Sequence, residues 1–315
     1  METPLTRIGI IGTGYLGRLH ARVLTEIPEA QVVGFVEPTD EIASQVEETL
    51  SIRRFRSIEE ILPEIQCAVV ASPTVTHADV ASAVLEAGCD VMVEKPITSA
   101  ADDARRLIDL ARSRNRIIQV GHVERYNPAI VAAAPLIESP RYVEAQRIGI
   151  FSNRSLDIDV LLDLMIHDLH LVISLLRKPI REVRAIGVPV LTDKIDIANV
   201  RLEFEDRSVA NLIASRVSSD RVRKFRVFGR ERYISVDTKE QEVKGYRLVK
   251  REGAMPSIEA LDITGKKKEP LRAELESFLE SVRTRQRPLV SGEDGLAALE
   301  LALRVGAAIE ESSRS

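Results

Sequence analysis

Two short stretches of the sequence carry side chains that can move a proton. Lys95 stands between a glutamate and a proline at the end of the apolar run 91–93. A lysine there can hydrogen-bond a hydroxyl or polarise a carbonyl group. Asp163 and His167 are four residues apart in an apolar segment with a helical pattern, so they should share one face of a helix. An aspartate that orients a histidine is a workable acid–base pair near neutral pH.

Each of these features also has a plain structural explanation. Lys95 and the preceding glutamate could form an ordinary ion pair at a strand end. His167 could be a histidine whose hydrogen bonds are satisfied inside a buried helix, and His170 lies roughly on the same face. The catalytic interpretation of Lys95, Asp163 and His167 therefore depends on the motifs that accompany them.

A glycine-rich stretch, GTGYLG at 12–17, predicts a dinucleotide site. It follows an apolar strand pattern and opens a helical one. Gly12 allows a tight turn, Gly14 lets the backbone approach a pyrophosphate, and Gly17 lets the helix pack closely on the strand. Free N–H groups at the start of the helix would receive the anion. The alternative is a glycine-rich turn without a ligand.

An acidic residue completes this pattern. Glu37 ends the next strand-like run, 20 residues after Gly17, and is followed by proline. A carboxylate there hydrogen-bonds the ribose hydroxyls of the adenosine and repels a 2′-phosphate. With no adjacent arginine in the sequence, Glu37 favours NAD over NADP as the cofactor.

A third stretch, ASPTVTHADVA at 71–81, follows another strand-like run. Such a loop lies at the carboxyl edge of a parallel sheet, where open α/β folds bind their ligands. His77 is an ambiguous candidate, since a histidine in the first turn of a helix could be a surface residue. The predicted cofactor-binding residues are Gly12, Thr13, Gly14, Tyr15, Leu16, Gly17, Glu37, Ser72, Pro73, Thr74, His77, Glu94 and Lys95.

The elements that position these residues fall into two patterns. Up to residue 122, strand-like runs alternate with helical stretches, which predicts a doubly wound parallel sheet. The runs are 7–12, 31–37, 67–73, 90–96 and 117–123, and the helical stretches are 15–26, 40–49, 75–87 and 100–114.

From residue 123 to the end, a helix at 157–178 precedes several strand-like runs without helices between them. This order predicts an α+β domain over 123–315 with an open, mostly antiparallel sheet. Helices are expected at 270–285 and 293–311, and these could pack back on the first domain. The segment 251–270 is predicted to be a loop.

Composition narrows the classes of function. The charged fraction is 29%, the net charge is −4, and aromatic residues make up 4%, so neither a basic field nor a stacking platform for nucleic acid is expected. Cys67 and Cys89 are expected to be reduced core residues. We see no metal-ligand spacing, no secretory leader and no membrane-spanning run, which predicts a cytoplasmic protein.

The motifs GIIGTGYLG, SPTVTHADVASAVLEAG, VMVEKPITS and VGHVERYNP together resemble the Gfo/Idh/MocA oxidoreductase family. The resemblance implies a Rossmann domain followed by an α/β domain with an open sheet. It also implies oxidation or reduction of a carbinol carbon of a sugar, cyclitol or sugar nucleotide with NAD or NADP. Lys95 is implied to contact the reacting hydroxyl, and Asp163 with His167 to face the nicotinamide. The family also implies a homodimer or homotetramer formed through the second sheet.

The sequence departs from the family near Asp163. Relatives often have two glycines before this aspartate, where this chain has the run 160–162 of valine and two leucines, and often an acid in place of His170. Arg125, Tyr126 and Asn127 could bind substrate hydroxyls or a diphosphate, or could simply pack and pair. The stretch GHVERYNPA, together with LMIHDL, resembles the UDP-N-acetylglucosamine 3-dehydrogenase subgroup. Enzymes of that subgroup act in the synthesis of amino sugars and lipid A precursors.

Three functions remain open at this stage. The leading hypothesis is oxidation of a sugar-nucleotide hydroxyl, with Lys95, Arg125, Tyr126, Asn127, Asp163 and His167 as the substrate-binding residues. The second is a dehydrogenase of a free cyclitol or aldose such as myo-inositol. The third is a dinucleotide-binding regulator without turnover, which would not need Lys95, Asp163 and His167.

Overall fold

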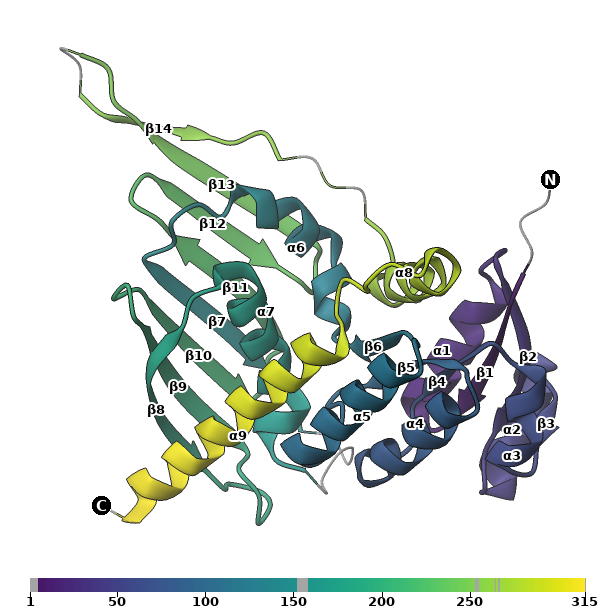
Figure 1. The fold of residues 1–315 in the computed structure, drawn as a ribbon. Coiled ribbons are helices and arrows are strands. Elements are labelled where there is room, and N and C mark those ends of the chain that lie inside the picture. The colour runs from purple at the N-terminus through teal and green to yellow at the C-terminus, as the bar shows by residue number, and fades with distance from the viewer. Residues whose placement is uncertain (1–4, 152–157, 253–254, 264, 266, 315) are drawn as a thin grey trace. The chain divides into compact units, whose positions relative to one another are not determined.

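A computed structural model describes residues 5–151, 158–252, 255–263, 265 and 267–314 (Figure 1). The chain divides into two compact units. The first unit comprises Met1–Val123 and Glu269–Leu296, and the second comprises Glu124–Lys268 and Ala297–Ser315. The first residue of the helix predicted at 157–178 lies outside the described residues.

The first unit is built on a six-stranded parallel sheet in the order β3-β2-β1-β4-β5-β6. Its strands are β1 (Thr6–Ile11), β2 (Ala30–Val36), β3 (Arg54–Phe55), β4 (Cys67–Val70), β5 (Asp90–Glu94) and β6 (Ile118–Gly121). Its helices are α1 (Tyr15–Thr25), α2 (Asp40–Leu50), α3 (Ile58–Ile61), α4 (His77–Glu86), α5 (Ala101–Ser113) and α8 (Pro270–Thr284). The order of strands reverses at β1 and β4, which is where ligands bind in such sheets.

The strands of the first unit are apolar because helices cover both faces of the sheet. Every residue of β4 and β5 is buried, as expected for central parallel strands. Helix α8 comes from the far end of the chain, yet Leu275 and Phe278 belong to the same core as Ile8 and Ile10 of β1. Cys67 and Cys89 are buried free thiols, as predicted.

The second unit is built on an eight-stranded sheet in the order β14-β13-β12-β11-β7-β10-β9-β8, in which only β7 and β10 run parallel. The strands are β7 (Tyr142–Ile148), β8 (Ile180–Val188), β9 (Ile197–Phe204), β10 (Val209–Ser215), β11 (Val222–Phe228), β12 (Arg232–Asp237), β13 (Glu242–Val249) and β14 (Ser257–Ala260). The mixed fold with a mostly antiparallel second sheet confirms the predicted fold class.

Helices cover one face of this sheet. They are α6 (Pro128–Ala133) and α7 (Ile166–Leu176), together with the later turns of α9 (Gly292–Arg314) (Figure 1). On the opposite face four aromatic rings form a ladder across adjacent strands. The ring centroids lie 5.5 Å apart for Tyr142 and Phe228, 4.8 Å for Phe228 and Tyr233, and 6.1 Å for Tyr233 and Tyr246.

Three local predictions were wrong. The segment predicted as a loop contains the edge strand β14. The short strand β3 and helix α3 were missed because they are only two and four residues long. The long helix begins with a π-helical turn, Leu161–Met165, instead of an α-helical one. In the described part of the chain, no helix combines the length and apolarity needed to cross a membrane.

Candidate active site

The glycine-rich turn between β1 and α1 has the geometry of a pyrophosphate cradle. Gly12 adopts φ +86°, and a Cβ there would lie 2.6 Å from the backbone nitrogen of Ser72. A Cβ on Gly17 would overlap the carbonyl oxygen of Gly12. In contrast, no atom lies within 4 Å of the Cβ position of Gly14. The tight turn requires Gly12, and the close helix–strand contact requires Gly17. Gly14 leaves the backbone open where a dinucleotide would approach it.

The carboxylate of Glu37 is fixed beside this turn. One oxygen accepts a hydrogen bond from the backbone N–H of Thr13 at 2.9 Å, and the other from that of Thr39 at 3.0 Å. The hydroxyl group of Thr13 also donates to the first oxygen at 3.3 Å, and these three bonds still leave a lone pair on the carboxylate for a ribose hydroxyl. The open backbone at Gly14 and this oriented acid fit a dinucleotide such as NAD.

An arginine that the linear sequence did not reveal also lies next to Glu37. Arg54 from β3 donates to the carbonyl oxygen of Glu37 at 2.8 Å and pairs with Asp40 at 2.6 Å. The side chain of Arg54 is largely buried, whereas that of Asp40 is exposed. Because the guanidinium is already engaged by a carboxylate and by carbonyl groups, fewer of its donors are left for a 2′-phosphate.

The three glycines make different predictions when each is replaced. Gly14→Ala adds a methyl group only where the dinucleotide would lie, so we expect NADH affinity to fall about 10–100-fold. The stability of the apoprotein should change by no more than about 1 kcal/mol. Gly17→Ala should destabilise the protein itself by at least about 1–3 kcal/mol, because the methyl group overlaps the backbone.

Fluorescence titration with NADH and chemical denaturation of both variants test this difference. If Gly14→Ala binds NADH as the unaltered protein does, the pyrophosphate does not lie against this turn. If Gly17→Ala is as stable as the unaltered protein, the close helix–strand contact is not needed.

Lys95 is half-buried and directly follows β5 at its carboxyl end. Hydrogen bonds of Glu94 fix the turn that carries it. The carboxylate of Glu94 accepts a hydrogen bond from the backbone N–H of Lys95 at 3.1 Å. Its other oxygen lies 2.6 Å from Nε2 of His20, a buried residue of α1. Burial alone would raise the pKa of Glu94, but the hydrogen bond and charge of His20, with the charge of Lys95, lower it. Glu94 therefore positions the turn that carries Lys95.

A second carboxyl group is buried close to Glu94. Glu274 of α8 is fully buried, and within the described residues neither of its carboxyl oxygens has a hydrogen-bond partner. Burial and the negative charge of Glu94 raise the pKa of Glu274 well above its ordinary value. Burial and this like charge therefore both favour the protonated form of Glu274 over the carboxylate. No local sequence pattern indicated this residue, since it lies in a helix far along the chain.

His77 joins the loop after β4 to the turn that carries Lys95. Its ring is 1% exposed, so it is not the surface histidine that the sequence left as an alternative. Nδ1 lies 2.9 Å from the carbonyl oxygen of Pro96, and Nε2 lies 2.9 Å from that of Ser72. Both ring nitrogens thus bridge backbone groups, which fixes one loop of the predicted cofactor site against the other. The hydroxyl groups of Ser72 and Thr76 are 2.7 Å apart in the same loop.

The predicted acid–base pair lies in the second unit. Asp163 is in the π-helical turn and His167 is in the first turn of α7, and both are half-buried. The wider π-turn, in which the N–H of Ile166 reaches the carbonyl oxygen of Leu161, changes the angle between residues four apart from that of an α-helix. Such turns recur at functional sites. The pairing of Asp163 with His167 stays a prediction.

A buried ion network lies beside this helix. The guanidinium of Arg147 in β7 binds Asp168 of α7 in two-pronged fashion, at 2.9 and 2.8 Å, and Glu124 at 2.7 Å. Burial alone would lower the pKa of Arg147, but the two carboxylates outweigh it and raise that pKa. The network connects the residue that follows His167 to the residue that precedes Arg125.

The predicted substrate residues at 125–127 have different environments. Tyr126 is 5% exposed and Asn127 is 2% exposed. The side chain of Asn127 accepts from the backbone N–H of Ala129, as the N-cap of α6, and donates to the carbonyl oxygen of Thr238 at 2.8 Å. The side chain of Asn127 thus stabilises the local structure. Arg125 is half-buried, so part of its side chain is accessible to a ligand.

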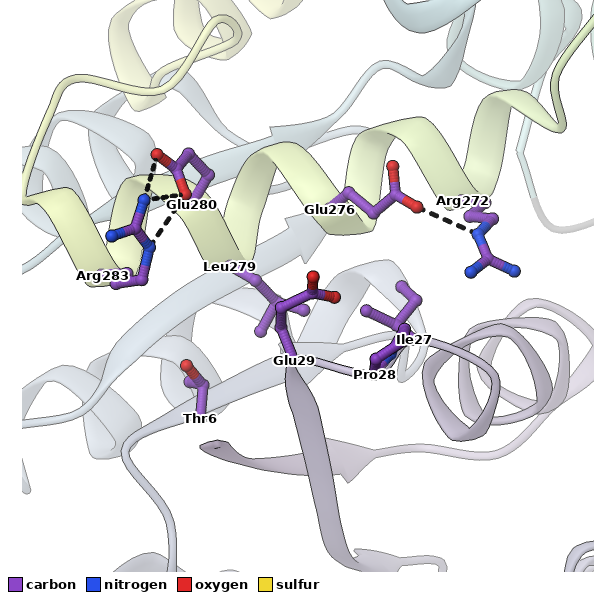
Figure 2. Close-up of a pocket in the computed structure, with 9 residues that line it drawn as sticks. All are labelled: Thr6, Ile27, Pro28, Glu29, Arg272, Glu276, Leu279, Glu280 and Arg283. Atoms are coloured by element: carbon purple, nitrogen blue, oxygen red, sulfur yellow. Dashed lines mark hydrogen bonds and ion pairs between the residues drawn. The ribbon is translucent and has the colours of Figure 1, made fainter. Parts of the chain in front are cut away.

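Two cavities are relevant to the search for a site. One of about 520 Å³ in the first unit lies at the amino-terminal edge of the parallel sheet, between Thr6 and α8. Figure 2 shows that its Arg272 and Arg283 point toward Glu276 and Glu280 of their own helix. This cavity is at the opposite edge from the glycine turn. The second, of about 270 Å³, lies in the second unit and is lined by Asp163 and three arginines.

Comparison with known proteins gives the following similarities. Residues 6–122 match the profile of the oxidoreductase family with an NAD-binding Rossmann fold, and residues 153–314 match its C-terminal alpha/beta domain. UDP-N-acetylglucosamine 3-dehydrogenase of Acidithiobacillus ferrooxidans is 37% identical, over 96% of this chain and 97% of that protein. A solved structure of that enzyme superposes with a TM-score of 0.89, covering 98% of this chain and 99% of the other.

Inositol dehydrogenases are less similar. Myo-inositol 2-dehydrogenase of Thermotoga maritima is 24% identical, over 97% of this chain and 96% of that protein. The scyllo-inositol 2-dehydrogenase (NAD(+)) of Bacillus subtilis is 27% identical, over 94% of this chain and 92% of that protein.

Proposed function

The chain belongs to the Gfo/Idh/MocA oxidoreductase family, and on that premise we propose that it oxidises the 3-hydroxyl of UDP-N-acetylglucosamine to a ketone with NAD. The observation that carries this proposal is the 37% identity with UDP-N-acetylglucosamine 3-dehydrogenase, which extends over nearly the whole of both chains. The inositol dehydrogenases, at 24% and 27%, support the same reaction type but not the same substrate.

The residues of this chain divide the work of the reaction. NAD, when bound, accepts the hydride that leaves the sugar carbon as the carbonyl bond forms. Lys95 would position the hydroxyl and stabilise the negative charge that develops on its oxygen. Either His167, oriented by Asp163, or Lys95 takes the hydroxyl proton. Glu94, His20 and His77 hold the turn of Lys95 through the contacts at 2.6 and 2.9 Å.

The proposed setting follows from the product. Because a 3-keto sugar nucleotide is a substrate for amination, we propose that the reaction serves amino-sugar and lipid A precursor synthesis in the cytoplasm. We also propose a homodimer or homotetramer formed through the open face of the second sheet. The ladder of Tyr142, Phe228, Tyr233 and Tyr246 on that face supports this proposal, since aromatic residues are enriched at interfaces. Light scattering of the purified protein measures the molar mass, and a monomer would contradict it.

The test of the function is NADH formation from NAD with UDP-N-acetylglucosamine, with myo-inositol and glucose measured in parallel. A coupled aminotransferase should remove the ketone, because oxidation of a secondary alcohol by NAD can be unfavourable at equilibrium. Turnover of the nucleotide sugar alone is the expected result. Turnover of a free polyol alone would overturn the substrate and retain the mechanism.

A further inference from the structure

The cavity of about 270 Å³ in the second unit combines positive charge with one carboxylate. Arg216, Arg221 and Arg223 line it together with Asp163. Arg216 directly follows β10, Arg221 directly precedes β11, Arg223 lies in β11, and Asp163 lies in the π-helical turn. The charges of the three arginines are not equally compensated, and this difference is what suggests a ligand.

Arg216 is neutralised within the protein. Its Nε lies 2.7 Å from the carboxylate of Asp196, which is fully buried, and its Nη1 donates to the carbonyl oxygen of Ile158 at 2.9 Å. The three backbone N–H groups of 190–192 also donate to Asp196. These contacts and Arg216 hold the pKa of Asp196 far below its ordinary value despite its burial. Arg216 therefore lines the cavity with its positive charge already paired with Asp196.

Arg223 and Arg221 carry charges without such compensation. Arg223 donates to the carbonyl oxygens of Ile148 and Val222, at 2.8 and 3.1 Å. Among the residues that the structure describes, no carboxylate lies within 4.0 Å of the guanidinium of Arg221 or Arg223. Burial and the neighbouring charge of Arg147 lower the pKa of Arg223, and the charges of Asp168 and Glu124 oppose this only in part. A half-buried cation in this situation gains free energy when an anion binds.

We propose that Arg221 and Arg223 bind the diphosphate of a nucleoside-diphosphate sugar in this cavity, an inference that rests on the proposed function. Two guanidinium groups match the two negative charges of a diphosphate diester, and each can donate two parallel hydrogen bonds to phosphate oxygens. Asp163 would repel the diphosphate but accept hydrogen bonds from sugar hydroxyls. A molecule that carries both groups can therefore satisfy both kinds of side chain that line the cavity.

The sequence offered residues 125–127 as candidates for binding substrate hydroxyls or a diphosphate, with packing and pairing as the alternative. Tyr126 and Asn127 are buried, and the amide of Asn127 is used by the cap of α6 and by Thr238. A free cyclitol could donate hydrogen bonds to Asp163, but it carries no anionic group that could pair with Arg221 and Arg223. The cavity therefore favours a substrate with a diphosphate over a neutral polyol.

The experiment measures binding of UDP to the NADH-loaded protein by calorimetry, and the KM and kcat for UDP-N-acetylglucosamine. Arg223→Met and Arg221→Met are each expected to raise the Kd of UDP and the KM about 10–100-fold, with kcat changed far less. Arg223→Lys should recover part of the affinity, because it restores the charge without the planar fork. The matched control is Arg226→Met, on the same strand, whose guanidinium already pairs with Glu144 at 3.2 Å.

Each outcome decides the proposal. Weakened UDP binding in Arg221→Met and Arg223→Met, with unchanged binding of UDP in Arg226→Met and of NADH in all variants, supports the site. Because Arg221 is exposed, its variant tests the proposal even if Arg223→Met folds poorly. If UDP binds all variants equally while UDP-N-acetylglucosamine is turned over, the site is wrong and the function stands. If the unaltered protein binds neither UDP nor UDP-N-acetylglucosamine, the proposed function fails and the site fails with it.

Discussion

Replacement of Lys95 by methionine is expected to lower kcat by about 10²–10⁴-fold while NADH still binds. The side chain is half-buried at the carboxyl end of β5, and its turn is held by Glu94 and His20 at 2.6 Å. Methionine keeps the length of the side chain and removes the ammonium group. The features that fit the dinucleotide, the turn at Gly14 and the carboxylate of Glu37, do not depend on this group.

Steady-state turnover and NADH titration of Lys95→Met measure the two effects separately. Lys239→Met is a matched control, because Lys239 is exposed and pairs with its neighbour Glu240. Lys95→Arg should recover little, since a guanidinium cannot replace the compact ammonium. The pH profile of His167→Asn separates the two candidate bases, because one limb of the profile disappears only when the base itself is removed. Loss of NADH binding in Lys95→Met, with kcat preserved in the bound form, would refute the catalytic role.

The first unit was predictable from the sequence because its signals are local. A parallel strand that is buried on both faces appears as a continuous apolar run, as in β4 and β5. The glycine turn and Glu37 also lie within one strand–helix–strand unit, so their spacing is visible directly. Helix α8 was recognisable as a helix, but nothing in its own pattern indicates that Leu275 and Phe278 join the core around β1.

The groups that hold the site in place were not predictable, because their partners are distant in the sequence. His20 and Glu94 are separated by 74 positions, and Arg54 reaches Glu37 from a strand of two residues. Glu274 adds a buried carboxyl group with a raised pKa from a third part of the chain. Each of these contacts is a property of the sheet order, which brings the ends of separate strands and helices to one place.

The structural role of Asn127 had a signal that was available. Asn127 was considered as a substrate-binding residue, which stays a prediction, and its side chain is the N-cap of α6. Asparagine followed by proline is a typical start of a helix, because proline at the first position needs no hydrogen-bond donor. The π-helical turn at Leu161–Met165 had no such signal, since apolar residues continue through it without a break.

Arg147→Met is expected to destabilise the second unit by about 3–5 kcal/mol, because it leaves Asp168 and Glu124 as buried carboxylates without their cation. Their side chains are 6% and 15% exposed in the intact network. Chemical denaturation followed by circular dichroism measures the loss. The control is Arg181→Met, which removes an exposed guanidinium paired with Glu203 and should cost less than about 1 kcal/mol.

The same variant tests whether the network supports catalysis. Asp168 is the neighbour of His167 in α7, so relaxation of this helix should lower kcat even where the protein is folded, while NADH binding to the first unit persists. Asp168→Asn in the Arg147→Met background should recover part of the lost stability, because it removes one of the unpaired charges. The Asp168→Asn single variant completes the cycle. If the losses of the two single variants add up to the loss of the double variant, Asp168 and Arg147 act independently, and the network has no role in positioning His167.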